Sequence, residues 1–169
     1  FARMPTAEFT PSDLNSLISD TLESFVEQHT QIIFQFIGER DMPAIYLDQE
    51  QIRRLLMNLL DNAVAALQHV QVDSPRKVTV KTTYSRRQDR MILEISDTGE
   101  GIKPEDKTRI FEPYFTTKKE GTGLGLAIVS SIVSDHKGTI RVYDNFPTGT
   151  KFVVELPLHQ DSIEKGRAV

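Results

Sequence analysis

Apolar residues recur every three or four positions in three stretches of the chain, which predicts helices over 10–26, 49–68 and 124–135. A fourth, shorter helix is expected over 104–110, because a proline suits the first turn of a helix. The ends of the long helices carry typical signals: Thr10 to cap the first, Asp48 with Gln51 as a capping box for the second, and Lys137-Gly138 to close the third.

Elsewhere apolar and polar side chains alternate, which predicts five strands. They are centred on 32–36, 78–82, 91–95, 140–142 and 152–156. Polar loops join the second strand to the third and the fourth to the fifth as hairpins, so a doubly wound parallel sheet is not expected. We expect an α+β fold, a two-layer α/β sandwich in which helices cover one face of a mixed, mostly antiparallel sheet.

Length and composition suit one domain with a hydrophobic core, since 38% of the 169 residues are hydrophobic and 26% are charged. We expect the domain to span residues 9–158, between a lead-in over 1–8 and a polar tail over 159–169. No apolar run is long enough to cross a membrane. Because the chain starts at Phe1 and not at a methionine, it is expected to be a fragment.

The overall charge narrows the range of partners. A net charge of −4 gives no general attraction to nucleic acid or anionic lipid, so nucleic acid is not an expected partner. Any phosphate binding must then come from local backbone and side-chain geometry. The absence of cysteine excludes disulfides and thiolate chemistry.

Two asparagines stand out on the second predicted helix. Asn58 and Asn62 are four residues apart, so they share one stripe of the helix, and this stripe borders the apolar sector. Taken alone, they are best read as boundary polar residues of an amphipathic helix. The functional alternative is that their amide oxygens face a cleft, where such oxygens are suitable ligands for Mg²⁺.

The sequence DTGEG, residues 97–101, directly follows a predicted strand. Taken alone, it is best read as a plain turn, because Asp and Gly favour turns for steric reasons. The functional alternative is that Asp97 accepts a hydrogen bond from an exocyclic amine such as that of adenine. Gly99 and Gly101 would then let a flat ring approach the backbone.

A glycine-rich segment over 121–125 precedes the third helix. Free amides at a helix start, without side chains in the way, can bind an anion, although such a segment also occurs as a flexible joint. It is not a Walker A loop, because no Gly-Lys-Ser/Thr follows, and no strand leads into it as a dinucleotide fingerprint requires. The segment 116–123 is polar and is expected to be mobile.

Two further segments each allow more than one interpretation. In FEPYFTTKK, residues 111–119, the aromatic residues suit a core, whereas Lys118 and Lys119 either reach a triphosphate or form a solvated pair. The dipeptide Gly149-Thr150 by itself is only a turn before the last strand.

The order of these segments is more specific than any one of them. NLLDNA (58–63), DTGEG (97–101), FEPYFTTK (111–118), GTGLGLAI (121–128) and GTKF (149–152) closely resemble the N, G1, F, G2 and G3 boxes of sensor histidine kinases. Those kinases belong to the ATPase group of gyrase, the Hsp90 chaperones and MutL, which share the Bergerat fold. The resemblance covers residues 9–158. The opening FARMP and the spelling of FEPYFTTK are most like the nitrogen-regulation branch.

The resemblance implies ATP and Mg²⁺ as ligands and assigns roles box by box. Asn62 would ligate Mg²⁺ with Asn58 beside it toward the phosphates, and Asp97 would bind the adenine amine. The remaining ATP-binding residues would be Gly99, Gly101, Ile102, Phe111, Lys118, Gly121, Thr122, Gly123, Leu124, Gly125, Leu126 and Thr150. One departure is the run Ala63-Val64-Ala65-Ala66, where many members carry a basic or aromatic residue, so Lys118 or Lys119 is expected to supply that phosphate contact.

The residue at position 58 distinguishes between the kinds of enzyme in the group that this chain resembles. In hydrolytic relatives and serine kinases of this group the matching residue is a glutamate base, whereas Asn58 cannot act as a base at neutral pH. Attack by water or serine requires proton removal, but neutral imidazole has a free lone pair. Asn58 therefore favours a histidine acceptor, with positioning and charge neutralisation as the domain's contribution. Asn58 and Asn62 are the predicted catalytic residues.

The acceptor itself is not expected in this chain. His29, His69, His136 and His159 lack the following acidic residue of the family's phosphorylated histidine, and they are expected at surface or boundary positions. The expected partners are an upstream dimerisation and phosphoacceptor domain, which FARMP would trail, and a cognate response regulator. The resemblance implies a cytoplasmic domain of a homodimeric parent, which could be an inner-membrane sensor, with the fragment itself a monomer. The alternatives are an ATPase switch of the gyrase or chaperone type and a pseudo-kinase that binds no nucleotide.

Overall fold

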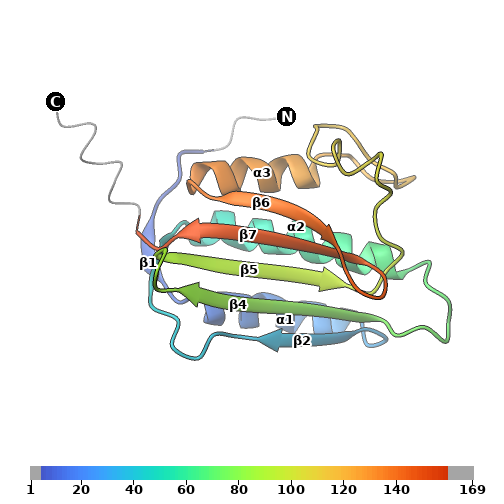
Figure 1. The fold of residues 1–169 in the computed structure, drawn as a ribbon, viewed down its shortest axis with the longest axis horizontal. Helices are drawn as coiled ribbons and strands as arrows, with labels where there is room; N and C mark the ends of the chain where they lie inside the picture. The colour runs from blue at the N-terminus through green and yellow to red at the C-terminus, as the bar shows by residue number, and fades with distance from the viewer. Residues whose placement is uncertain (1–4, 160–169) are drawn as a thin grey trace.

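The fold is taken from a computed structural model that describes residues 5–159. Five strands form one sheet in the order β2-β4-β5-β7-β6 (Figure 1). Only β2 and β4 run parallel, and the other neighbouring pairs are antiparallel. The bounds are β2 Ile33–Ile37, β4 Lys77–Ser85, β5 Arg90–Asp97, β6 Thr139–Asp144 and β7 Thr150–Pro157. The mixed, mostly antiparallel sheet predicted from the alternation is confirmed.

Three helices cover one face of this sheet: α1 Leu14–Gln28, α2 Gln49–Leu67 and α3 Gly125–Asp135. In Figure 1, α1 and α2 lie behind the sheet and α3 lies beside β6. Burial alternates strictly along β4, β5 and β7 over most of their length, which is the pattern of a sheet with one covered face. The helix α2 is central, since it contacts both other helices and the strands β4 and β5.

The apolar sector of α2 forms the middle of the core. Its seven residues are each at most 3% exposed: Ile52, Leu55, Leu56, Leu59, Leu60, Ala63 and Leu67. Each fully buried leucine or isoleucine contributes roughly 1.5–3 kcal/mol relative to an exposed one. The stripe that carries the two asparagines therefore lies on a helix that cannot rotate without losing this burial.

The start of the chain differs from the prediction. Residues Thr10–Ser12 form a strand, β1, which pairs antiparallel with β3, Ile45–Leu47. Helix α1 begins only at Leu14, and its N-cap is Asp13, whose side chain accepts from the Ser16 amide at 3.0 Å. The predicted cap at Thr10 was wrong because its pairing partner lies more than thirty residues away in the chain.

The helix predicted over 104–110 is also absent. The segment forms successive turns, in which Asp106 N donates to Lys103 O at 2.9 Å and Arg109 N donates to Asp106 O at 2.8 Å. Within this segment only Lys107 N, which reaches Lys103 O at 3.3 Å, makes a bond of the α-helical i to i−4 type. One such bond does not propagate a helix, because nucleation costs more than one bond returns.

The capping box of α2 is half formed. Asp48 accepts from the Gln51 amide at 3.0 Å, but its own amide donates to His136 Nε2 at 3.1 Å. The Gln51 side-chain amide is buried without a hydrogen-bond partner in the described part of the chain. His136 is 0% exposed, so the expectation that every histidine lies at the surface or a boundary was wrong for this one.

The N-terminal lead-in of the domain packs near this histidine. The Glu8 amide donates to Asp48 Oδ2 at 2.8 Å, and the Phe9 ring packs on the Tyr46 and His136 rings at 5.9 and 5.0 Å. The lead-in is thus docked from Glu8 onward. Residues 1–4 of the expected lead-in and 160–169 of the expected tail lie outside the described residues. None of the helices over 5–159 is long and apolar enough to cross a membrane.

Candidate nucleotide-binding site

Asn58 and Asn62 lie half-buried on the side of α2 that faces α3 and the preceding loop. The Asn58 amide nitrogen donates back to Arg54 O at 2.9 Å, so its oxygen is turned away from its own helix. This oxygen lies 3.1 Å from the point where a Cβ at Gly125 would be. The glycine thus lets the first turn of α3 approach Asn58 closely.

The Asn62 side-chain oxygen accepts a hydrogen bond from Lys118 Nζ at 2.7 Å. Although Lys118 as a whole is exposed, its ammonium end lies against α2, and this desolvation lowers the pKa of Lys118, with Asp61 opposing. Desolvation raises the pKa of Asp61, with Lys118 and His29 opposing. The structure therefore has a cation on the oxygen that the sequence singled out as a metal ligand.

Asp97 ends β5 and is 4% exposed. Its Oδ1 accepts from the amides of Gly99 at 2.9 Å and Thr150 at 3.3 Å. Its Oδ2 receives no hydrogen bond from residues 5–159 and is not enclosed. Burial raises the pKa of Asp97, and the two amide bonds oppose this. One carboxylate oxygen is therefore used to hold the loop, and the other remains available to a ligand.

Close backbone packing surrounds this carboxylate. A Cβ at Gly99 would lie 2.8 Å from the Cβ of Ala66, so the G1 loop rests on the end of α2. Gly101 has a φ of +81°, and a Cβ at this position would lie 3.3 Å from the Gly149 carbonyl oxygen. The small side chain of Ala66 permits this contact.

Two residues that sequence reasoning missed hold the turn between β6 and β7 against Asp97. Asn145 Nδ2 donates to Asp97 O at 2.8 Å, and Thr148 Oγ1 donates to Gly99 O at 2.8 Å. The sequence signal for them was only the turn composition NFPTG, which says nothing of a partner about fifty residues away.

The loop 115–122 is closed at its base by Tyr114 and Gly123. Tyr114 N donates to Gly123 O at 2.8 Å, and any Cβ at Gly123 would overlap the Tyr114 backbone. Both residues have positive φ, +66° and +72°. Beyond this neck, α3 starts at Gly125, and its N-cap residue Leu124 makes no side-chain capping bond to the first amides of the helix.

The other predicted site residues are distributed between core and loop. Phe111 packs edge-on against Phe152 with ring centroids 6.3 Å apart, which supports its reading as a core residue. Ile102 and Leu126 are partly buried against the core. Thr122 Oγ1 accepts from the Leu124 amide at 3.3 Å, so it shapes the entry to α3.

A sequence profile of one protein family, described as histidine kinase-, DNA gyrase B- and HSP90-like ATPase, matches residues 47–160. The chain belongs to this ATPase family. It is 33% identical over 144 residues to the nitrogen regulation protein NtrY of Azorhizobium caulinodans, covering 85% of this chain and 18% of that protein. It is 35% identical over 150 residues to the sensor histidine kinase ZraS of Escherichia coli strain K12, covering 87% and 30%.

Solved structures agree with this membership. The catalytic domain of histidine kinase ThkA matches with a TM-score of 0.78 at 31% identity, covering 89% of this chain and 98% of that one. Full-length ShkA in complex with AMPPNP matches with a TM-score of 0.77 at 26% identity, covering 92% and 32%. The chain is thus an ATP-binding domain of the sensor histidine kinase type, and it spans less than a third of the length of the curated relatives named above.

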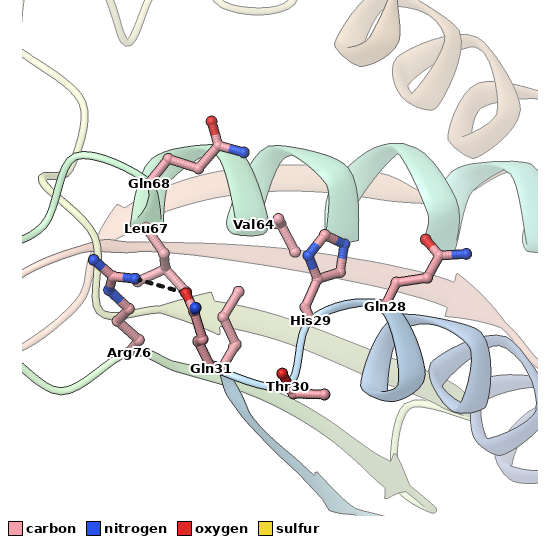
Figure 2. Close-up of a pocket in the computed structure, with 9 residues that line it drawn as sticks. Gln28, His29, Thr30, Gln31, Val64, Leu67, Gln68 and Arg76 are labelled. Atoms are coloured by element: carbon pink, nitrogen blue, oxygen red, sulfur yellow. Dashed lines mark hydrogen bonds between the residues drawn. The ribbon is translucent and has the colours of Figure 1, made fainter.

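A separate hollow of about 270 Å³ lies between the C-terminal part of α2 and the α1–β2 connection (Figure 2). It is lined by Gln28–Ile32, Val64, Leu67, Gln68 and Arg76, none of which is a predicted ATP-binding residue. Both terminal nitrogens of Arg76 are already used, by Gln31 Oε1 at 3.4 Å and Val70 O at 3.2 Å.

Proposed function

We propose that this domain binds Mg²⁺–ATP and transfers the γ-phosphoryl group to a histidine on a dimerisation domain outside this chain. The supporting observation is that the five boxes, joined by Ala66 on the same helix as the N box, form one continuous series of contacts. These contacts are Asn58 with Gly125, Asn62 with Lys118, Ala66 with Gly99, Asp97 with Thr150, and Tyr114 with Gly123. Segments up to about ninety residues apart thus surround a single site.

At one end of this site, Asp97 is proposed to bind the adenine amine through Oδ2. Leaving a buried carboxylate without a hydrogen-bond donor is costly. Asp97 therefore favours adenine, which offers an amine, over a base that has a carbonyl at that position. Gly99, Gly101 and Ile102 would shape the pocket, and Thr150 would close it. At the other end, the segment 121–126 would wrap the phosphates with its amides.

Asn62 is the proposed Mg²⁺ ligand. The donor set fits this ion, because an amide oxygen is a hard ligand and Mg²⁺ takes few protein groups, completing its shell with phosphates and water. The contact from Lys118 at 2.7 Å supports this assignment, since the same oxygen already attracts a cation. When bound, Mg²⁺ would neutralise charge on the phosphates during transfer.

Asn58 supports transfer to histidine. Its amide cannot remove a proton, so the site suits an acceptor that attacks through a lone pair. Its oxygen lies against the start of α3, where it would orient the phosphates. His136 is excluded as an internal acceptor because it is buried and Nε2 accepts from Asp48 N at 3.1 Å.

The partners follow from the relatives. ThkA has been solved in complex with the response regulator TrrA, which supports a cognate response regulator for the protein that contains this domain. We propose that the parent is a homodimer joined upstream of this chain, and that the domain lies in the cytoplasm, where ATP is available. The parent could be an inner-membrane sensor.

Binding is tested first, by calorimetric titration of the domain with ATP in Mg²⁺ and in EDTA. We expect one site, with weaker binding in EDTA, and loss of the Mg²⁺ effect in Asn62→Ala. An unchanged metal dependence in Asn62→Ala would remove the ligand role from this residue. No nucleotide binding by the wild type would favour the pseudo-kinase instead.

Transfer is tested by mixing the domain with its separately produced upstream helical domain and labelled ATP. We expect an acid-labile label on a histidine of the helical domain and no stable label on this chain. Label on a serine would contradict the proposal. Robust steady-state ATP hydrolysis by the domain alone would favour the alternative, an ATPase switch of the gyrase or chaperone type.

A further inference from the structure

The contact between Lys118 and Asn62 joins a loop to the central helix. Lys118 lies in the loop 115–122, and its Nζ donates to Asn62 Oδ1 at 2.7 Å across 56 positions of sequence. Within the loop, the Lys118 amide donates to Thr116 Oγ1 at 3.0 Å, and its carbonyl accepts from Gly121 N at 3.3 Å. The loop therefore has internal bonds, and Lys118 is its one hydrogen-bonded link to α2 among the described residues.

We propose that Lys118 is an internal counter-cation that holds the loop 115–122 against α2 in the nucleotide-free protein, and that it must move from Asn62 to the triphosphate when Mg²⁺–ATP binds. This inference rests on the proposed function, because it assumes that Asn62 is the metal ligand. It adds that metal and lysine compete for the same oxygen.

The competition follows from charge and distance. Mg²⁺ bonds oxygen at about 2.0–2.1 Å, and a second cation at hydrogen-bond distance from that oxygen would be strongly repelled. An ammonium has three donors and no acceptor, so it gains by exchanging one amide oxygen for several phosphate oxygens. ATP thus supplies both the ion that displaces Lys118 and the anion that receives it.

Asp61 stabilises the nucleotide-free arrangement. It precedes Asn62 on α2 and attracts the Lys118 ammonium electrostatically. The neck between Tyr114 and Gly123 lets the loop move as a unit without disturbing α3, because the backbone bond at 2.8 Å closes the loop at its base. The movement that the exchange requires is thus confined to 115–122.

The test compares Lys118→Met with Lys119→Met, since Met keeps the length of the stem and Lys119 has no hydrogen bond or ion pair with any residue of the described range 5–159. In the nucleotide-free protein, the Asn62 side-chain amide signals should shift in Lys118→Met only. Backbone hydrogen exchange over 115–122 should become faster in that variant only. Identical spectra and exchange in both variants would overturn the proposal.

Calorimetric titration with ATP provides a second readout, in which the affinity without metal and the effect of Mg²⁺ on affinity should change in opposite directions. In EDTA, Lys118→Met should bind ATP more weakly than wild type, because the phosphates lose a cation. Without metal, the wild-type ammonium can keep Asn62 while its other donors contact the phosphates, whereas with Mg²⁺ it gives up Asn62. The ratio of the dissociation constant in EDTA to that in Mg²⁺ should therefore rise by about two- to fivefold in Lys118→Met, which has no charged hydrogen bond of about 0.5–1 kcal/mol to lose to the metal. A ratio that is unchanged or lower would contradict the exchange.

Failure of the exchange and failure of the proposed function give different results. If wild type binds Mg²⁺–ATP but Lys118→Met behaves as Lys119→Met, the function stands and the exchange is wrong. If wild type binds no nucleotide, the proposed function is wrong and the exchange is overturned with it. If ATP binding is intact but Asn62→Ala keeps its metal dependence, Lys118 and the metal do not share a ligand.

Discussion

The Asp97 carbonyl occupies the space where a Cβ at Gly149 would lie, so the end of β5 and the turn before β7 are in backbone contact. Gly149 has a φ of +112°, a conformation that side chains rarely adopt. The next residue, Thr150, donates its amide to Asp97 Oδ1 at 3.3 Å. The glycine thus brings the G3 box onto the carboxylate of the G1 box.

We expect Gly149→Ala to lower both stability and ATP affinity. The added methyl must displace the Asp97 backbone, and the positive φ is strained, which together cost about 2–3 kcal/mol. Chemical denaturation of the nucleotide-free protein measures the first effect, and calorimetric titration with Mg²⁺–ATP measures the second. An unchanged denaturation midpoint would show that the turn relaxes without affecting Asp97.

Asp97→Asn should separate stability from function. Burial raises the folded-state pKa of Asp97, so folding favours the protonated carboxyl, and the ionised form lowers stability at pH values above that pKa. The isosteric amide should therefore raise the melting temperature of the nucleotide-free protein at pH 7. This advantage should shrink as the pH falls through the folded pKa toward the ordinary value of 3.8.

The same variant should bind ATP about 10- to 100-fold more weakly, because the adenine amine loses a charged acceptor. Glu100→Gln is the matched control, since Glu100 is an exposed carboxylate in the same loop. If both variants keep wild-type affinity, Asp97 does not recognise the nucleotide.

Gly123→Ala should open the neck of the loop 115–122. Its Cβ would overlap the Tyr114 backbone, and its φ of +72° costs a non-glycine residue about 1–2 kcal/mol. We expect faster hydrogen exchange in the loop and weaker Mg²⁺–ATP binding. In Gly121→Ala the nearest atom is the Thr116 hydroxyl, a side-chain group that can rotate, and no positive φ is involved. Because Gly121 is itself a proposed phosphate-binding residue, the two variants are compared by hydrogen exchange, and equal exchange rates in the loop would contradict a structural neck at Gly123.

His136 should make stability depend on pH. Burial lowers the folded pKa of His136 below its ordinary 6.5, so the unfolded chain takes up the proton first as the pH falls. Stability is therefore highest above pH 6.5 and decreases below it until the folded pKa is reached. Urea denaturation in steps of about one pH unit between pH 7.5 and pH 5 measures how the free energy of unfolding changes with pH.

His136→Gln should be less stable at pH 7 by about 1–3 kcal/mol, because it disturbs the bonds to Ile132 O and Asp48 N. Its stability should also vary less between pH 7.5 and about pH 5 than that of the wild type. His69→Gln, at an exposed position, should keep the wild-type slope. A slope in His136→Gln equal to that of the wild type would assign the pH dependence to other groups.

Much of the fold was predictable from periodicity. The apolar sector of α2 and the alternation along β5 both appear in the structure as predicted, because burial on one face imposes a period that any sequence must follow. The strand β1 was not predictable in the same way. A three-residue strand such as Thr10–Ser12 is too short to show a period, and it forms only because Ile45–Leu47 pairs with it.

The candidate site shows the same division. The order of the five boxes along the chain predicted the family and the ligand class, because each box keeps its local residue types at adjacent positions. The hydrogen bonds that define the site were not readable from the sequence. Lys118 reaches Asn62 over 56 residues, and Asn145 reaches Asp97 over 48.

By itself, therefore, the sequence determined which faces are buried and which ATPase family the chain belongs to, and it predicted which residue types line the candidate site. Only the tertiary structure decided that His136 is buried as a link to Asp48, that Gly123 and Gly149 make room for backbone, and that a lysine lies on the Asn62 oxygen. Local patterns record what a residue is next to along the chain. These contacts join residues that become neighbours only when the helices and the sheet pack together.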